Sequence, residues 1–124
     1  MKHFALALIL ALSFSACVPP PPNLTPQAVS AFNKTRVIKA LDLVRDTAIA
    51  ANAEVPSVIS TDDTRKIVTA HESLLKIMDA TDSGWQPTVK TTLDELVKNL
   101  SAKEQPIVQP YVLLVENILV EITK

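Results

Sequence analysis

Gly84 is the only glycine in this 124-residue sequence, and its isolation limits the folds open to the chain. Sheet proteins with several tight turns normally place glycine where the backbone dihedral φ must be positive, whereas helices need few such positions. Hydrophobic residues make up 48% of the chain and aromatic residues only 4%. We therefore predict an all-α fold with an aliphatic core of Leu, Ile, Val and Ala.

The first predicted helix covers residues 26–53. Thr25 can accept a backbone hydrogen bond as the N-cap, and Pro26 suits the first helical position. No residue breaks the helix before about Ala53, and apolar residues recur at spacings of four and three along one face. This face consists of Val37, Leu41, Val44, Ala48 and Ala51.

Two further helices are predicted over residues 61–81 and 86–100. Ser60 or Thr61 can act as the N-cap of the second helix. Gly84 is expected to end that helix in the left-handed conformation, because glycine carries no Cβ penalty there. Apolar residues have helical spacing in both segments.

The last predicted helix covers residues 102–122. Ser101 and Glu104 have the spacing of a capping box. Pro106 and Pro110 each lack a backbone donor and clash with the preceding turn, so we expect a kink, or a short turn followed by a straight helix. The complete pattern predicts a small antiparallel bundle of three to four helices.

The N-terminal residues 1–16 have the organisation of a bacterial export signal. Lys2 provides a short cationic start, and the apolar run Phe4–Leu12 follows it. This run is much shorter than the ~20 residues that span a bilayer core. We therefore interpret residues 1–16 as a signal peptide.

The segment Phe14-Ser15-Ala16-Cys17 resembles the lipobox of bacterial lipoproteins, with Phe14 at the position where leucine is usual. The resemblance implies that Cys17 receives a diacylglyceryl group and becomes the acylated first residue of the mature protein, carrying fatty acids such as palmitate. Cys17 is the only cysteine, so an intrachain disulfide is excluded and lipidation accounts for the lone thiol. The alternative is ordinary cleavage after Ser15 or Ala16, which gives a soluble periplasmic or secreted protein.

Residues 17–25 are interpreted as a tether between the lipidated cysteine and a helical domain over residues 26–124. Four consecutive prolines, Pro19–Pro22, favour an extended polyproline conformation of about 3.1 Å per residue. Such a segment holds a domain away from a membrane surface. The lipoprotein resemblance also implies outer-membrane sorting, facing the periplasm, because Val18 replaces the aspartate that favours retention in the inner membrane.

Charge and composition exclude several classes of function. Loss of residues 1–16 removes Lys2 and leaves 11 basic against 13 acidic residues, a net charge of −2. This charge argues against a nucleic-acid surface, which needs a dense cationic face. A single glycine leaves no glycine-rich phosphate loop, and we expect no cofactor.

Catalytic and metal-binding candidates are few. His71 is the only histidine after residue 16, and it lies on the apolar face of its helix, so we interpret it as a core imidazole with one hydrogen-bond partner. The pair Asp62-Asp63 is interpreted as a complement to the helix dipole. The pair Asp94-Glu95 is interpreted as part of a solvated face. We predict that the protein is not an enzyme and holds no metal.

Three residues are candidates for a surface that contacts a protein partner or a second copy. Leu113 and Val120 lie on the polar side of the last helix. Trp85 follows the turn at Gly84, where it either anchors a partner or closes one end of the core.

The leading functional hypothesis is a membrane-anchored cell-envelope lipoprotein that acts as a non-enzymatic interaction or structural module. One alternative is a periplasmic helical bundle that holds a lipid or another apolar ligand between its helices. Another is a lipoprotein encoded by a phage or prophage for lysis or exclusion, which the small size and the proline tether also fit.

Overall fold

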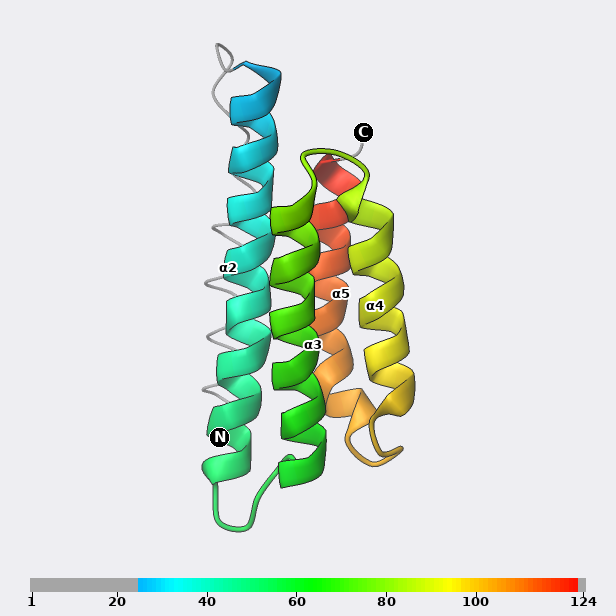
Figure 1. Ribbon diagram of the computed structural model, residues 1–124. Helices are drawn as coiled ribbons and strands as arrows, with labels where there is room; N and C mark the ends of the chain where they lie inside the picture. The colour runs from blue at the N-terminus through cyan, green and yellow to red at the C-terminus, as the bar shows by residue number, and fades with distance from the viewer. Residues whose placement is uncertain (1–24, 123–124) are drawn as a thin grey trace.

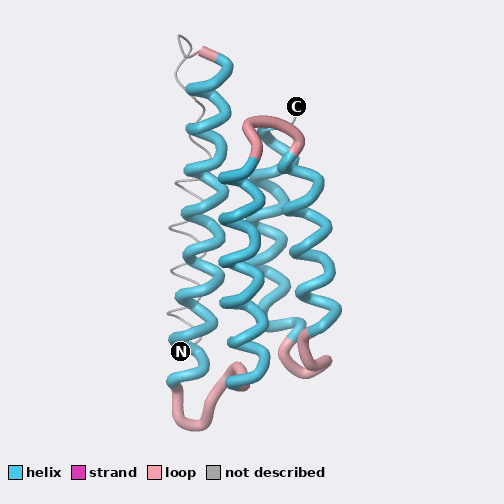
Figure 2. The backbone as a smooth tube through the Cα atoms, in the orientation of Figure 1, coloured by secondary structure: helices cyan, strands magenta, loops and turns pink. Residues whose placement is uncertain are grey.

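The computed structural model describes residues 25–122, which form four α-helices and no strand. The helices are α2 (Pro26–Ala53), α3 (Thr61–Ala80), α4 (Trp85–Asn99) and α5 (Gln105–Ile122). They run alternately up and down, joined by short connections (Figures 1 and 2). The predicted all-α bundle is therefore confirmed. The predicted signal peptide and Cys17 lie outside the described residues.

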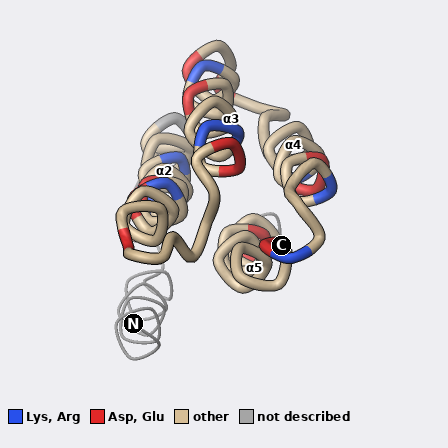
Figure 3. Tube along the Cα trace, turned by 90° about the horizontal axis from the view of Figure 1, so that it is seen from below, with Lys and Arg blue, Asp and Glu red and all other residues tan. Residues whose placement is uncertain are grey.

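The four helices surround one core, as Figure 3 shows in a view along the bundle. α2 packs against α3 and α5, and α4 packs against the same two helices. α2 and α5 are thus neighbours in space, although they are the first and last helices of the described chain. The two helices of each packed pair run in opposite directions (Figure 1).

The core is aliphatic, as the composition predicts, and Trp85 and Ile59 fill its two ends. Trp85 is 1% exposed where α4 begins, and Ile59 is 2% exposed in the connection that precedes α3. Burying one large aliphatic side chain contributes about 1.5–3 kcal/mol. The largest buried side chains also include Ile67, Leu74, Met78, Leu93, Val37, Val89, Val112 and Val115.

Side-chain caps fix the first residues of α2 and α3. Thr25 Oγ1 accepts a hydrogen bond from the Ala28 N–H at 3.1 Å. Ser60 Oγ accepts one from the Asp63 N–H at 3.2 Å. α2 has the predicted bounds, because its N-cap and the proline at its first position are both local signals.

Gly84 adopts the predicted left-handed conformation, with φ of 77°, but its predicted role as the end of the second helix is wrong. α3 already ends at Ala80, where Thr81 is extended and its Oγ1 accepts a hydrogen bond from the Ser83 N–H at 3.2 Å. This local turn separates Gly84 from α3. Gly84 instead directly precedes α4.

The last helix begins three residues later than predicted, at Gln105. Ser101 O accepts hydrogen bonds from the N–H groups of Glu104 and Gln105, at 2.9 and 3.1 Å, so a turn precedes the helix. Pro106 then lies in the first helical turn, where its missing N–H is not needed. Pro110 lies inside α5, which continues without interruption to Ile122. Of the two expectations, the short turn followed by a helix is correct.

Candidate functional site

The outward side of α5 carries an exposed stripe of uncharged residues, which we call the α5 outer face. Leu113 is 45% exposed and Val120 is 53% exposed, as expected for a contact surface. Three more exposed residues lie on the same side of the helix at helical spacing. The complete α5 outer face is Pro106, Pro110, Leu113, Asn117 and Val120.

α5 differs in charge from the other three helices. Exposed lysine, arginine, aspartate and glutamate residues occur on α2, α3 and α4, whereas Glu121 is the only exposed charged residue within α5. Figure 3 shows α5 as mostly uncharged along its length. An apolar, uncharged stripe on one helix of a bundle is typical of a contact surface.

The two acidic residues of α5 flank the outer face and are engaged by neighbouring helices. Glu121 Oε1 lies 3.3 Å from Nη2 of the buried Arg36 on α2. Glu116 lies towards α4, where burial, together with a hydrogen bond to Asp94, raises its pKa to about 7. Hydrogen bonds from Glu116 and Lys90 lower the pKa of Asp94. Both acidic groups beside the outer face are therefore engaged by neighbouring helices, although Glu121 stays exposed.

The α4 carboxylates only partly fit the prediction of a solvated face. Glu95 is exposed, as predicted. Asp94 is half-buried, and its Oδ2 lies 2.9 Å from Nζ of Lys90. The partner Glu116 comes from another helix, which is why adjacency in the sequence did not reveal the pairing.

Trp85 does not belong to an exposed surface. Its side chain is 1% exposed and closes the core at the end where α4 begins. Of the two sequence-based interpretations, core closure is correct and the assignment of Trp85 to a partner surface is wrong. The left-handed Gly84 directly precedes this buried residue.

His71 is buried at 4% exposure and has one polar partner. Its Nε2 lies 2.6 Å from Oδ1 of Asp42 on α2. This confirms the interpretation of His71 as a core imidazole with one hydrogen-bond partner. The pair links the buried imidazole on α3 to a carboxylate on α2 whose side chain is 41% exposed.

Two exposed serines and two buried carboxylates form a polar cluster at the end of the bundle opposite Trp85. The Ser101 N–H and Oγ both contact Asp63 Oδ2, at 3.0 and 2.8 Å. The Ser60 N–H donates to Glu104 Oε1, and Ser60 Oγ lies 3.2 Å from Glu104 Oε2. We call Ser60, Asp63, Ser101 and Glu104 the serine–carboxylate cluster.

The cluster exchanges the caps of two chain segments. In an ordinary capping box, the carboxylate three residues after the serine accepts the N–H of that same serine. Here Asp63 accepts the N–H of Ser101, while Glu104 accepts the N–H of Ser60. The exchange fastens the start of α3 to the turn before α5. It also corrects the interpretation of Asp63, which is buried at 2% exposure and binds Ser101 rather than only complementing a helix dipole.

The sequence contained a signal for this cluster in the matching spacings Ser60-x-x-Asp63 and Ser101-x-x-Glu104. Only Ser101-x-x-Glu104 is predicted as a capping box, because a spacing within one segment does not show a contact with another segment. Burial raises the pKa of Asp63, but the hydrogen bonds from Glu104 and Ser101 outweigh it and bring the pKa below its ordinary value. The cluster is thus a structural fastening.

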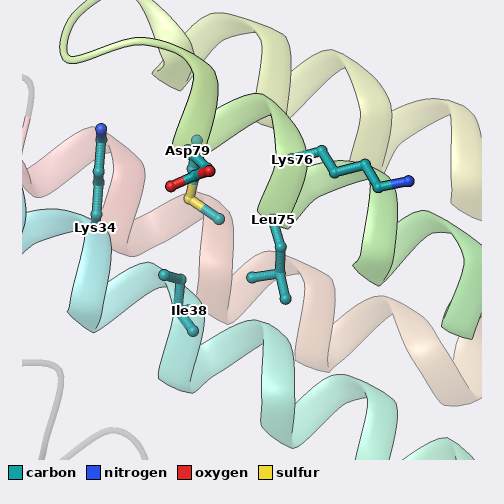
Figure 4. A pocket seen from close by; sticks show the side chains of 6 residues that line it. Lys34, Ile38, Leu75, Lys76 and Asp79 are labelled. Atoms are coloured by element: carbon teal, nitrogen blue, oxygen red, sulfur yellow. The ribbon is translucent and has the colours of Figure 1, made fainter.

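A shallow groove of about 440 Å³ lies between α2 and α3 (Figure 4). Ile38 and Leu75 form its apolar part, and Met78 also lines it. In Figure 4, Asp79 and Lys34 stand near one another at one side, whereas Lys76 extends away. Lys34 Nζ donates to the Thr81 carbonyl at 2.6 Å, so this lysine fastens α2 to the end of α3.

Residues 25–122 contain neither a metal-binding cluster nor a membrane-spanning helix. No group of three or more His, Cys, Asp and Glu residues there is arranged to hold a metal ion. None of the four helices is long and apolar enough to cross a membrane.

Comparison with known proteins gave no relative from which a function can be transferred. No protein-family model, curated protein or solved structure matches the chain.

Proposed function

We propose that the protein is an exported lipoprotein whose four-helix domain is anchored through acylated Cys17 and acts as a non-enzymatic interaction module. The observation that carries the proposal is the position of the only cysteine, directly after the signal-like residues 1–16 and with only Val18 between it and the proline run Pro19–Pro22. The helical domain begins at Pro26, directly after the proposed tether of residues 17–25. The anchor places the domain on the periplasmic side of the outer membrane.

The polar groups of the bundle interior favour an interaction role over catalysis. His71 contacts Asp42, and Asp63 contacts Ser101. Both contacts join one helix or turn to another, so these groups act as fastenings of the fold. The α5 outer face is the surface that we assign to partner contact.

Intact mass of the membrane-extracted protein tests the anchor. We expect a chain that begins at Cys17 and carries the mass of two or three acyl chains, because a single chain binds a membrane only marginally. Cys17→Ser is the matched variant, and it should lose both the acyl mass and the membrane association. An unmodified wild-type chain that begins at Ala16 or Cys17 would overturn the proposal.

A second candidate function, binding of an acyl chain or similar apolar ligand, is favoured by the groove between α2 and α3. Ile38 and Leu75 offer apolar contact in this groove. Native mass spectrometry of the exported Cys17→Ser protein tests it, because any lipid then found is bound rather than covalent. Recovery of the protein without lipid, together with an unchanged mass after incubation with palmitate, would exclude this candidate.

A further inference from the structure

The α5 outer face has the spacing of a coiled-coil seam. From Pro106 to Val120 its residues follow one another at intervals of four, three, four and three. In a heptad written abcdefg, this spacing puts Pro110 and Asn117 at positions a, and Leu113 at a position d. A helix face that only contacts water usually carries charged residues, whereas none of these five positions does.

Asn117 gives the seam a preferred partner. A single asparagine at an a position pairs with its own equivalent in a parallel two-stranded arrangement, where it fixes register at some cost in stability. Leu113 and Val120 lie one half-heptad on either side and are 45% and 53% exposed. An identical helix therefore supplies both the apolar partners and the matching amide.

The charges beside the seam decide whether two identical copies can approach. In a parallel pair, Glu116 at position g faces Glu121 of the second copy at position e, which would be repulsive for two free carboxylates. Glu121 is paired with the buried Arg36 at 3.3 Å, and the guanidinium offsets its negative charge. The bundle itself thus reduces the repulsion that a bare helix would have.

We infer that the α5 outer face binds the α5 outer face of a second copy, in parallel, about a twofold axis that runs along the bundle. The inference rests on the proposed lipid anchor. The start of α2, where the tether ends, and the C-terminal end of α5 lie at the same end of the bundle (Figure 1). Two copies anchored in one membrane therefore present their α5 helices in the same direction.

The pair is expected to form on the membrane and to be weak in solution. Five side chains per copy cover much less than the ~800 Å² per partner of a standard stable interface. Anchoring both copies in one bilayer raises their effective concentration and offsets the small area.

Disulfide trapping in native membranes tests the pairing. In the full-length chain Asn117→Cys places a thiol at the predicted axis, and mild oxidation should yield a covalent dimer. Glu72→Cys, on the exposed side of α3, is the matched control and should remain monomeric. Adding Leu113→Glu to Asn117→Cys should lower the dimer yield about tenfold, which corresponds to about 1.4 kcal/mol.

The outcomes separate this inference from the proposed function. Cys17 of the unsubstituted chain is scored in parallel with a thiol-reactive polyethylene glycol, and labelling there would mean that the lipid anchor is wrong. If Cys17 is blocked, the Asn117→Cys and Glu72→Cys proteins could form equal amounts of covalent dimer, or neither could form any. Either result would overturn the pairing through α5 and leave the proposed lipid anchor unaffected. Trapping between Leu113→Cys and Asn117→Cys copies in preference to like pairs would overturn the parallel orientation. Circular dichroism checks that each variant is folded. If Asn117→Cys is not folded, the Asn117→Ser protein is treated with a chemical crosslinker instead.

Discussion

The Ser101 N–H donates to Oδ2 of Asp63 at 3.0 Å, although the two residues are 38 positions apart in the chain. Each carboxylate of the serine–carboxylate cluster caps the segment that carries the other. The cluster therefore couples the start of α3 to the turn before α5, and loss of one carboxylate affects both.

Asp63→Asn should destabilise the bundle by about 2 kcal/mol at pH 7, because a buried hydrogen-bonded charge is removed. Asp62→Asn is the control, since the Asp62 side chain is 71% exposed, and it should change stability little. Urea unfolding followed by circular dichroism measures both. Equal midpoints for the two variants would contradict a fastening role for Asp63.

The contribution of Asp63 should also depend on pH. Its pKa in the folded protein is below the value of an unfolded aspartate, because hydrogen bonds from Glu104 and Ser101 outweigh the effect of burial. The stabilisation is therefore present above the unfolded pKa and is lost as pH falls through the folded pKa. The difference between wild type and Asp63→Asn should shrink in acid, and a constant difference from pH 7 to pH 2 would argue against this assignment.

Glu116→Gln should stabilise the protein at pH 8 and change it little at pH 4. Burial and Asp94 raise the folded pKa of Glu116 to about 7, so stability falls as pH rises from the unfolded pKa through 7. Replacing the carboxyl group by an amide should therefore raise the free energy of unfolding by on the order of 2 kcal/mol at pH 8. Glu95→Gln on the exposed side of α4 is the control, and thermal unfolding across this pH range is the measurement.

Gly84→Ala should destabilise the protein by about 1 kcal/mol, because a residue with a Cβ is strained at φ of 77°. A Cβ added there would meet no atom within 4 Å, so the loss should come from the backbone alone. Gly84→Asn should lose less, since asparagine tolerates this conformation. If the alanine and asparagine variants unfold at the same urea concentration, backbone strain is not the cause.

The fluorescence of Trp85 should report a buried indole. Trp85 is the only tryptophan, so the signal belongs to one site. We expect emission at shorter wavelength than free tryptophan, weak quenching by iodide, and a red shift on unfolding. Strong iodide quenching in the folded protein would show that the Trp85 indole is exposed and would contradict its assignment to the core.

The sequence predicted the helices well where the signals are local. Thr25 and Pro26, which are adjacent in the chain, together predict the start of α2. The predicted range of α2 is correct at both ends. The start of α5 was misplaced, because a turn held by Ser101 O resembles a first helical turn in spacing. The apolar periodicity of α5 correctly predicts that Leu113 and Val120 lie on its exposed side. A helical wheel requires only the sequence of that one helix.

Contacts between segments were not predictable in the same way. His71 contacts Asp42, which lies one helix earlier, and Asp94 contacts Glu116, which lies one helix later, as well as Lys90 on its own helix. A wheel gives the side of a helix that faces inward, but it does not give the rotation of one helix against another. That rotation decides which carboxylate meets which partner.

The first and last described residues lie at one end of the bundle (Figure 1), which has a practical consequence for labelling the protein. A reporter fused after the C-terminal end of α5 would stand beside the proposed anchor and crowd the membrane. Val55, 95% exposed in the connection at the opposite end, is the better position for a fluorophore or an inserted epitope. A probe there would lie at the end of the bundle farthest from the proposed anchor.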